Sequence, residues 1–268
     1  SEFPFIPKLA TGTGYAMDAA VLKEAISQVA FAVSASESRP ELAGVACYFQ
    51  GEMSGHDRCV FAATDSYRLT ERVISLQAGS NGQSAKCIVP ARAINEVGRL
   101  LGAYKDEVGV PERVDWLMAE SQFVLSYGNV ELVSRLIDGS FPDYRQIIPT
   151  QFRTVATVAR QEVAKAIRAA SLFSRQGLYD VHMEVKSGAL VVTSSDSGTG
   201  THTAELAAEI SGETSNKVLL NYKYVMDGLN AMGTDRVAFH LIDAMNPVVL
   251  KAPEGAAGLQ YIVMPIRQ

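Results

Sequence analysis

KCIVPARAINEVGRLLG, the run at residues 86–102, has a counterpart further along the chain, KVLLNYKYVMDGLNAMG at residues 217–233. Each run begins with a lysine and a short apolar stretch typical of a strand, and continues with apolar residues at helical spacing. Each run ends at a glycine, which suits the left-handed position that closes many helices. The two runs therefore predict the same strand-then-helix element at two places in the chain.

The segments around these two runs recur in the same order. VLKEAISQVAFAVS from Val21 corresponds to VAKAIRAASLFSR from Val163, and both have the pattern of an amphipathic helix followed by strand-like pairs. Residues 113–141 and 236–266 both alternate with period two between turn residues, which is typical of antiparallel meanders. Unrelated helix-plus-hairpin segments also resemble each other at low identity, but the shared order of the segments favours an internal repeat.

The repeat predicts the fold class and the domain organisation. At 268 residues the chain fits two domains of about 100–200 residues each. Pro149 interrupts the pattern and a new strand is expected from Thr154, so we expect domains at residues 1–150 and 151–268. The predicted fold is α+β, with two tandem domains that each pack two helices on antiparallel sheets. The helices are expected at residues 17–34, 90–102, 159–175 and 221–233.

Composition indicates an ordinary globular protein, with 47% hydrophobic and 20% charged residues. No apolar run approaches the roughly 18 residues that cross a bilayer, and no signal-peptide pattern opens the sequence, so we predict a cytoplasmic location. Three separate cysteines, Cys47, Cys59 and Cys87, form no C-x-x-C pair. We expect them to be reduced apolar residues rather than a disulfide framework or a zinc site.

Residue patterns typical of catalysis do not occur in the sequence. It has no phosphate-binding loop, nucleophile elbow or zinc-protease helix motif, and its histidines are scattered. SSDSGTGTHT at residues 194–203 lies between strands and opens no helix, which favours a hairpin turn over a phosphate site. We therefore predict a protein that is not an enzyme and needs no cofactor or metal, although an unrecognised enzyme stays an open alternative.

Charge is distributed unevenly along the chain. The formal net charge is -5, yet the four expected helices contain eight basic and five acidic residues. Two interpretations stay open for this small basic excess. The charges belong to ordinary solvated helix faces, or they form a surface that contacts phosphates without reading bases.

Four motifs carry a resemblance to a known family: RPELAGV at residues 39–45, ATDSYRL at 63–69, SRLIDGSFPDYRQIIP at 134–149 and YIVMPIR at 261–267. With these motifs the chain resembles the bacterial DNA polymerase III beta sliding clamps. The resemblance covers essentially the whole chain and corresponds to the second and third clamp domains of that family, without the first. It implies a processivity factor that tethers polymerases and repair proteins to duplex DNA.

The resemblance also implies a pocket at the junction of these two domains, which receives a short, partly apolar peptide from polymerases, the clamp loader and repair proteins. Apolar walls would hold an anchoring side chain, and polar groups would orient the peptide. By similarity the pocket residues are Leu42, Thr64, Ser66, Tyr67, Arg68, Leu69, Pro142, Gln146, Ile147, Asn221, Tyr224, Pro247, Ile262, Val263, Met264, Pro265, Ile266 and Arg267. Tyr67, Gln146 and Ile266 depart from common family residues, which leaves the preferred peptide open.

Double-stranded DNA is the second implied partner, encircled without regard to its sequence. Charge and approximate family position assign the contacts with DNA to Lys23, Arg39, Arg92, Lys165, Arg168 and Lys223. In the family two three-domain chains close into a homodimeric ring, so we expect this chain to be monomeric or weakly associated. A two-domain clamp that closes as a homotrimer stays an open alternative.

Overall fold

The computed structural model describes residues 12–36, 38–80, 83–103, 112–253 and 258–267. These residues divide into two compact units. The first unit runs to Ala63 and includes Arg72–Phe141, and the second comprises Thr64–Glu71 and the chain from Pro142 onward. The chain thus passes into the second unit at Pro142, before the boundary expected near residue 150. A short segment of the first half also groups with the second unit, which the repeat did not indicate.

In the first half of the chain, strands precede, separate and follow two α-helices. Its elements are β1 (Thr13–Asp18), α1 (Ala19–Val29), the 3-10 helices η1 (Ala30–Ala32) and η2 (Pro40–Leu42), β2 (Gly44–Phe49), β3 (Arg58–Thr64), β4 (Arg68–Ser75), β5 (Ala85–Pro90), α2 (Ala91–Ala103), β6 (Arg113–Met118), β7 (Gln122–Tyr127) and β8 (Val130–Arg135). Strand β4 begins in the second unit and ends in the first.

The second half follows the same order after a short 3-10 helix. Its elements are η3 (Tyr144–Ile147), β9 (Thr154–Ala159), α3 (Arg160–Ser171), β10 (Asp180–Lys186), β11 (Ala189–Asp196), β12 (Gly200–Ala207), β13 (Glu209–Gly212), β14 (Lys217–Asn221), α4 (Tyr222–Ala231), β15 (Arg236–Leu241), β16 (Val248–Lys251) and β17 (Leu259–Val263).

Strand pairing confirms the internal repeat. In the first unit β1, β6, β7 and β8 pair in that order, and in the second β9, β15, β16 and β17 do the same, all antiparallel. Likewise β2 lies between β3 and β5, as β10 lies between β11 and β14. The predicted α+β fold, with two helices and antiparallel sheets in each copy, is therefore correct.

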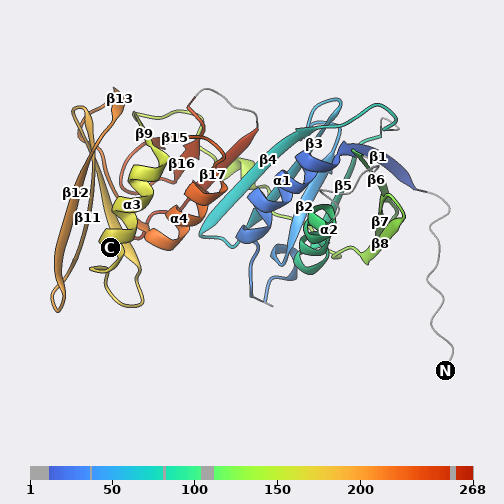
Figure 1. Cartoon of the computed structure of the whole chain (residues 1–268), viewed down its shortest axis with the longest axis horizontal. Coiled ribbons are helices and arrows are strands. Elements are labelled where there is room, and N and C mark those ends of the chain that lie inside the picture. The colour runs from blue at the N-terminus through green and yellow to red at the C-terminus, as the bar shows by residue number, and fades with distance from the viewer. Residues whose placement is uncertain (1–11, 37, 81–82, 104–111, 254–257, 268) are drawn as a thin grey trace. The chain divides into compact units, whose positions relative to one another are not determined.

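The helices pair within each unit: α1 contacts α2, and α3 contacts α4 (Figure 1). Asp18 caps α1, since its Oδ1 accepts a hydrogen bond from the Val21 amide at 2.9 Å. The prediction of left-handed glycines at the helix ends is wrong. Helix α2 continues through Gly102, α4 ends at Ala231, and neither Gly102 nor Gly233 has a positive φ.

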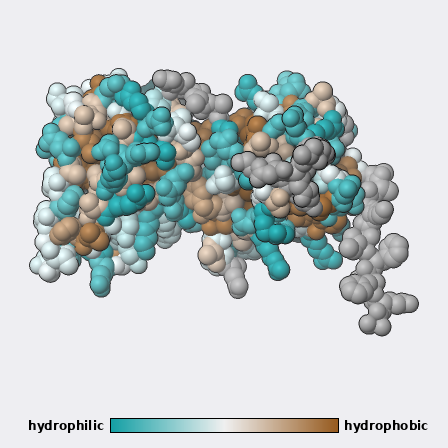
Figure 2. Space-filling model, viewed as in Figure 1, coloured by the Kyte–Doolittle hydropathy of each residue, from teal (hydrophilic) through white to brown (hydrophobic). Residues whose placement is uncertain are grey.

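Aromatic residues fill the core of the first unit. Trp116 is fully buried, with ring centroids 5.6 Å from Phe49 and 4.6 Å from Phe123. Ile167 of α3 and Phe239 of β15 are buried in the second unit. On the face drawn in Figure 2, hydrophilic residues are spread over both units between smaller hydrophobic patches. Burial of apolar side chains on these sheet faces provides most of the driving force for folding.

Several sequence features have ordinary structural roles. Cys47 and Cys59 are buried free thiols, and burial raises the pKa of both. Residues 194–203 form the expected hairpin, in which Asp196 opposes Gly200 and accepts a hydrogen bond from the Gly198 amide at 2.9 Å. Within the described ranges, no helix is long and apolar enough to cross a membrane, and no cluster of three metal-ligating side chains occurs.

Candidate functional site

The turn between β3 and β4 is fixed by its own side chains. Thr64 Oγ1 donates a hydrogen bond to the Arg68 carbonyl at 2.7 Å and accepts one from the Ser66 amide at 3.1 Å. Asp65 Oδ1 accepts from the amides of Tyr67 and Arg68 at 2.9 and 3.0 Å. Ser66 has a φ of 79°, and Asp65 caps the turn in the manner typical of Asx residues. The turn consequently presents Tyr67 to solvent, with 63% of the residue exposed.

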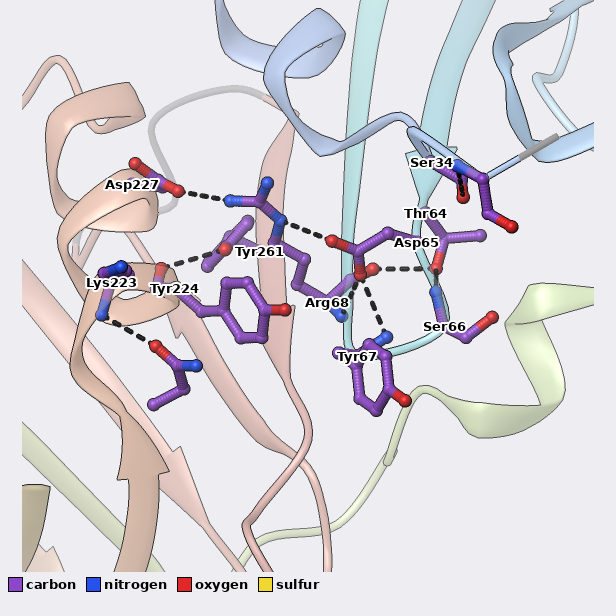
Figure 3. A network of polar contacts seen from close by, with 12 residues as sticks. Ser34, Thr64, Asp65, Ser66, Tyr67, Arg68, Lys223, Tyr224, Asp227 and Tyr261 are labelled. Atoms are coloured by element: carbon purple, nitrogen blue, oxygen red, sulfur yellow. Dashed lines mark hydrogen bonds and ion pairs between the residues drawn. The ribbon is translucent and has the colours of Figure 1, made fainter. Parts of the chain in front are cut away.

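Arg68 connects this turn to helix α4. Its Nε donates to Asp65 Oδ2 at 2.9 Å, its Nη1 forms an ion pair with Asp227, and its guanidinium lies 4.8 Å from the Tyr224 ring centroid (Figure 3). Burial alone would lower the pKa of Arg68, but its interactions with Tyr261 and Asp65 outweigh burial and raise that pKa. The side chain is only 13% exposed, so it acts as a fixed, charged support for the turn.

The beginning of α4 presents the second group of predicted residues. Asn221 caps the helix, with its Oδ1 accepting from the Lys223 amide at 2.9 Å. Tyr224 follows in the first turn, and its ring stacks against that of Tyr67 with centroids 6.4 Å apart and planes at 18°. The two rings offer adjacent aromatic faces beside the Arg68 guanidinium.

Tyr261 of β17 packs against α4 and holds it through a hydrogen bond. Its hydroxyl donates to the Tyr224 carbonyl at 2.9 Å, and burial raises its pKa far above the usual range, so the hydroxyl remains protonated. Gly228 makes the close approach possible, because a Cβ there would overlap the Tyr261 ring. The position of Tyr224 therefore depends on Gly228 and Tyr261.

The C-terminal segment passes next to the turn. The Met264 amide donates to the Tyr67 carbonyl at 2.9 Å, and the Ile266 amide donates to the Leu219 carbonyl at 2.8 Å. Met264, Pro265 and Ile266 are half-buried, whereas Ile262 and Val263 lie in the core. We define the Tyr67 surface as the predicted residues that make these contacts or lie beside them in the chain: Ser66, Tyr67, Arg68, Asn221, Tyr224, Met264, Pro265 and Ile266.

The remaining predicted peptide-contacting residues have varied positions. Gln146 and Ile147 are exposed in η3, where Gln146 Nε2 donates to Asp143 Oδ2 at 2.7 Å. Pro247 precedes β16, whose Val248 pairs with Val263. Other predicted residues of the second unit are the half-buried Pro142, the exposed Arg267 and the buried Thr64 and Leu69. Leu42 is a buried residue of η2 in the first unit.

Sequence reasoning missed the residues that hold this surface in place. Asp227 and Tyr261 meet Arg68 and Tyr224 from distant parts of the chain, and Glu71 accepts a hydrogen bond from Gln260 at 2.7 Å. One signal was present, since Asp65 lies within the ATDSYRL motif and a buried arginine requires a carboxylate partner.

The six basic candidates do not form a uniform set. Three of them lie on separate helices: Lys23 on α1, Arg92 on α2 and Arg168 on α3. Arg92 and Arg168 are exposed. Lys165 pairs with Glu162 at 3.1 Å, and Lys223 places its ammonium 3.4 Å from the Tyr179 ring centroid. Arg39 precedes η2, outside the four expected helices, and pairs with Glu41 at 3.1 Å.

Comparisons with known proteins agree with this architecture. The central domain of the DNA polymerase III beta subunit matches residues 16–143, and the C-terminal domain of that subunit matches residues 145–267. The beta sliding clamp of Staphylococcus aureus is 31% identical over 268 residues, which are 99% of this chain and 67% of the relative.

Solved structures give the same result for the fold. The DNA polymerase sliding clamp from Bacillus subtilis superimposes with a TM-score of 0.90 at 28% identity, over 100% of this chain and 67% of that one. The DNA polymerase III subunit beta from Pseudomonas aeruginosa shares the fold at 23% identity and a TM-score of 0.89, over 100% of this chain and 69% of that one. The chain therefore belongs to the family of bacterial DNA polymerase III beta subunits, the beta sliding clamps, and corresponds to its central and C-terminal domains.

Proposed function

We propose that the Tyr67 surface binds short, partly apolar peptide segments of DNA polymerases, the clamp loader and repair proteins. The processivity-factor function itself follows from membership of the sliding clamp family. In this proposal the chain tethers its partners and does not catalyse a reaction. The observation that carries the proposal is the meeting of the Tyr67 turn, the start of α4 and the C-terminal segment.

Chemistry supports a peptide as the ligand. The stacked rings of Tyr67 and Tyr224 provide rigid apolar area with polar hydroxyl ends, as is common at protein interfaces. Met264 is half-buried next to them, and its flexible thioether adapts to side chains of different shape. Arg68 has no freedom to swing out, because two carboxylates hold it. We propose that Pro142, Gln146, Ile147, Pro247 and Arg267 of the second unit extend this surface.

Fluorescence polarisation with a fluorescein-labelled peptide carrying the clamp-binding motif of a bacterial replicative polymerase tests the proposal. We expect Met264→Ala and Tyr224→Ala each to weaken binding by about tenfold, as is typical of central interface residues. Leu172→Ala is the control, because Leu172 is 75% exposed at the end of α3 and outside the Tyr67 surface. Unchanged affinity in both site variants would refute the proposal.

We also propose that the basic side chains on the helices contact duplex DNA through its phosphates. The observed helices retain a small excess of basic over acidic residues. Because phosphate contacts release counterions, Arg92→Ala and Arg168→Ala should each reduce the salt dependence of DNA binding by about 0.9 in the log-log slope. Lys186→Ala, at the end of strand β10, should leave the slope unchanged. Equal slopes in all three variants would contradict this assignment.

A further inference from the structure

Glu71 in β4 is a buried carboxylate with both oxygens engaged. The residue is 6% exposed. Its Oε1 accepts from Gln260 Nε2 at 2.7 Å, and its Oε2 accepts from the Tyr144 hydroxyl at 2.5 Å. Arg145 Nε lies 3.8 Å from Oε2 and forms an ion pair. A carboxylate removed from water is expensive unless it is paired in this way, so the arrangement is specific rather than incidental.

These partners connect Glu71 to two segments that carry predicted peptide contacts. Tyr144 and Arg145 form the first half of η3, and the second half is Gln146 and Ile147. Gln260 belongs to β17, which runs directly into the C-terminal residues of the Tyr67 surface. One carboxylate thus links β4, η3 and β17, although these elements are far apart in the sequence.

The short helix η3 has little to hold it in place by itself. It spans only Tyr144–Ile147, and 3-10 helices of this length have weak internal hydrogen bonding. The Ile148 amide donates to the Arg145 carbonyl at 3.2 Å, and the Tyr144 amide donates to the Pro142 carbonyl at 2.8 Å. Tyr144 is buried, at 2% exposure, whereas Ile147 is 45% exposed. The buried end of η3 therefore determines where its exposed end lies.

We propose that Glu71 is a positioning residue for peptide binding, which orients η3 through the Tyr144 hydroxyl so that Ile147 is held where the peptide contacts it. The proposal rests on the peptide-binding function proposed above. It assigns Glu71 no contact with the peptide. The Tyr144 hydroxyl bond acts on Ile147 and not on Met264, whose amide is held by the Tyr67 carbonyl instead.

A double-mutant cycle tests this route, measured by polarisation with the same fluorescein-labelled peptide. Tyr144→Phe removes only the hydroxyl, and we expect it to weaken peptide binding about fivefold, which is less than the full effect of one buried hydrogen bond to a charged group because Ile147 is displaced and not removed. Added to Ile147→Ala, it should produce no further loss, because the residue it positions is already gone. Added to Met264→Ala, it should multiply the loss, because that residue is positioned independently.

Ser194→Ala is the matched control for a general loss of stability. Ser194 is buried in the same unit, and its hydroxyl donates to the Asp180 carbonyl at 3.1 Å. We expect this variant to bind the peptide as the wild type does. Circular dichroism of each variant checks that it is folded, and Glu71→Gln, which keeps the side-chain size, provides a second way to weaken the link.

The outcomes separate this inference from the function on which it rests. Wild-type affinity in both Tyr144→Phe and Glu71→Gln would refute the positioning role, as would losses that multiply between Tyr144→Phe and Ile147→Ala. A loss with Met264→Ala but none with Ile147→Ala would also refute it, while leaving the proposed function intact. Unchanged binding in both Met264→Ala and Ile147→Ala would refute the proposed function and the inference together.

Discussion

Replacing Gly228 by alanine should destabilise the protein, although the same change usually stabilises a helix by about 1 kcal/mol. A Cβ at Gly228 would overlap Cδ1 and Cε1 of Tyr261 and lie 3.1 Å from Cγ. The Tyr261 ring is fully buried, and its hydroxyl is bonded to the Tyr224 carbonyl at 2.9 Å, so it has no space to withdraw. Overpacking of this kind costs about 3 kcal/mol at the upper end of its usual range. After the gain of about 1 kcal/mol from the better helix former, the free energy of unfolding should fall by about 2 kcal/mol.

Gly102→Ala is the matched comparison in α2. A Cβ at Gly102 would meet only the flexible end of the Lys23 side chain, with Nζ at 3.4 Å and Cε at 3.5 Å. In thermal unfolding followed by circular dichroism, we expect the Tm to fall by about 4–8 °C in Gly228→Ala. We expect it to stay level or rise in Gly102→Ala. In a protein that already carries Tyr261→Leu, Gly228→Ala should lower the Tm much less than it does in the wild type. Equal stability of Gly228→Ala and Gly102→Ala would refute the reasoning.

Charge substitutions provide the remaining predictions. Arg68→Met should lower the free energy of unfolding in urea by about 3 kcal/mol, because it leaves the partly buried Asp65 without its cation. Asp227→Asn should lower the free energy of unfolding by only about 0.5 kcal/mol, since that side chain is 42% exposed. Arg99→Met on the α2 surface should leave the urea midpoint of unfolding unchanged. Equal midpoints for the two arginine variants would contradict this ranking. Burial lowers the pKa of His240 in the folded protein, so as the pH falls the histidine of the unfolded chain is protonated before that of the folded chain. The free energy of unfolding should therefore decrease as the pH drops below about 6.5, the usual pKa of histidine. His240→Gln should flatten that decline, and an unaltered pH profile of urea midpoints would count against it.

Sequence predicted the fold well where the signal was local and repeated. The strand-then-helix runs at residues 86–102 and 217–233 became β5–α2 and β14–α4, because apolar spacing depends only on neighbouring residues. The helix ends were less predictable. Helix α4 ends at Ala231 with Met232 already extended, since the conformation there depends on the chain that follows and not on the presence of Gly233.

The candidate site was predicted unevenly for a related reason. Motif resemblance indicated Tyr67 and Arg68, and the structure places Tyr67 next to Met264 of another motif and Arg68 next to Asp65 of its own motif. The supporting partners were not apparent, because their relation to the motif exists only in three dimensions. Asp227 lies 159 residues from Arg68 in the sequence, and no local pattern marks it as the arginine's partner.

The grouping of Thr64–Glu71 with the second unit has a consequence for recombination between relatives. A duplication copies contiguous sequence, whereas this unit is assembled from two separate pieces of chain. A chimera that exchanges relatives at Pro142 would combine one parent's Tyr67 and Arg68 with the other parent's Asp227 and Met264. Compatible exchange therefore requires two crossovers in the first half, so that residues 64–71 are inherited together with the C-terminal half.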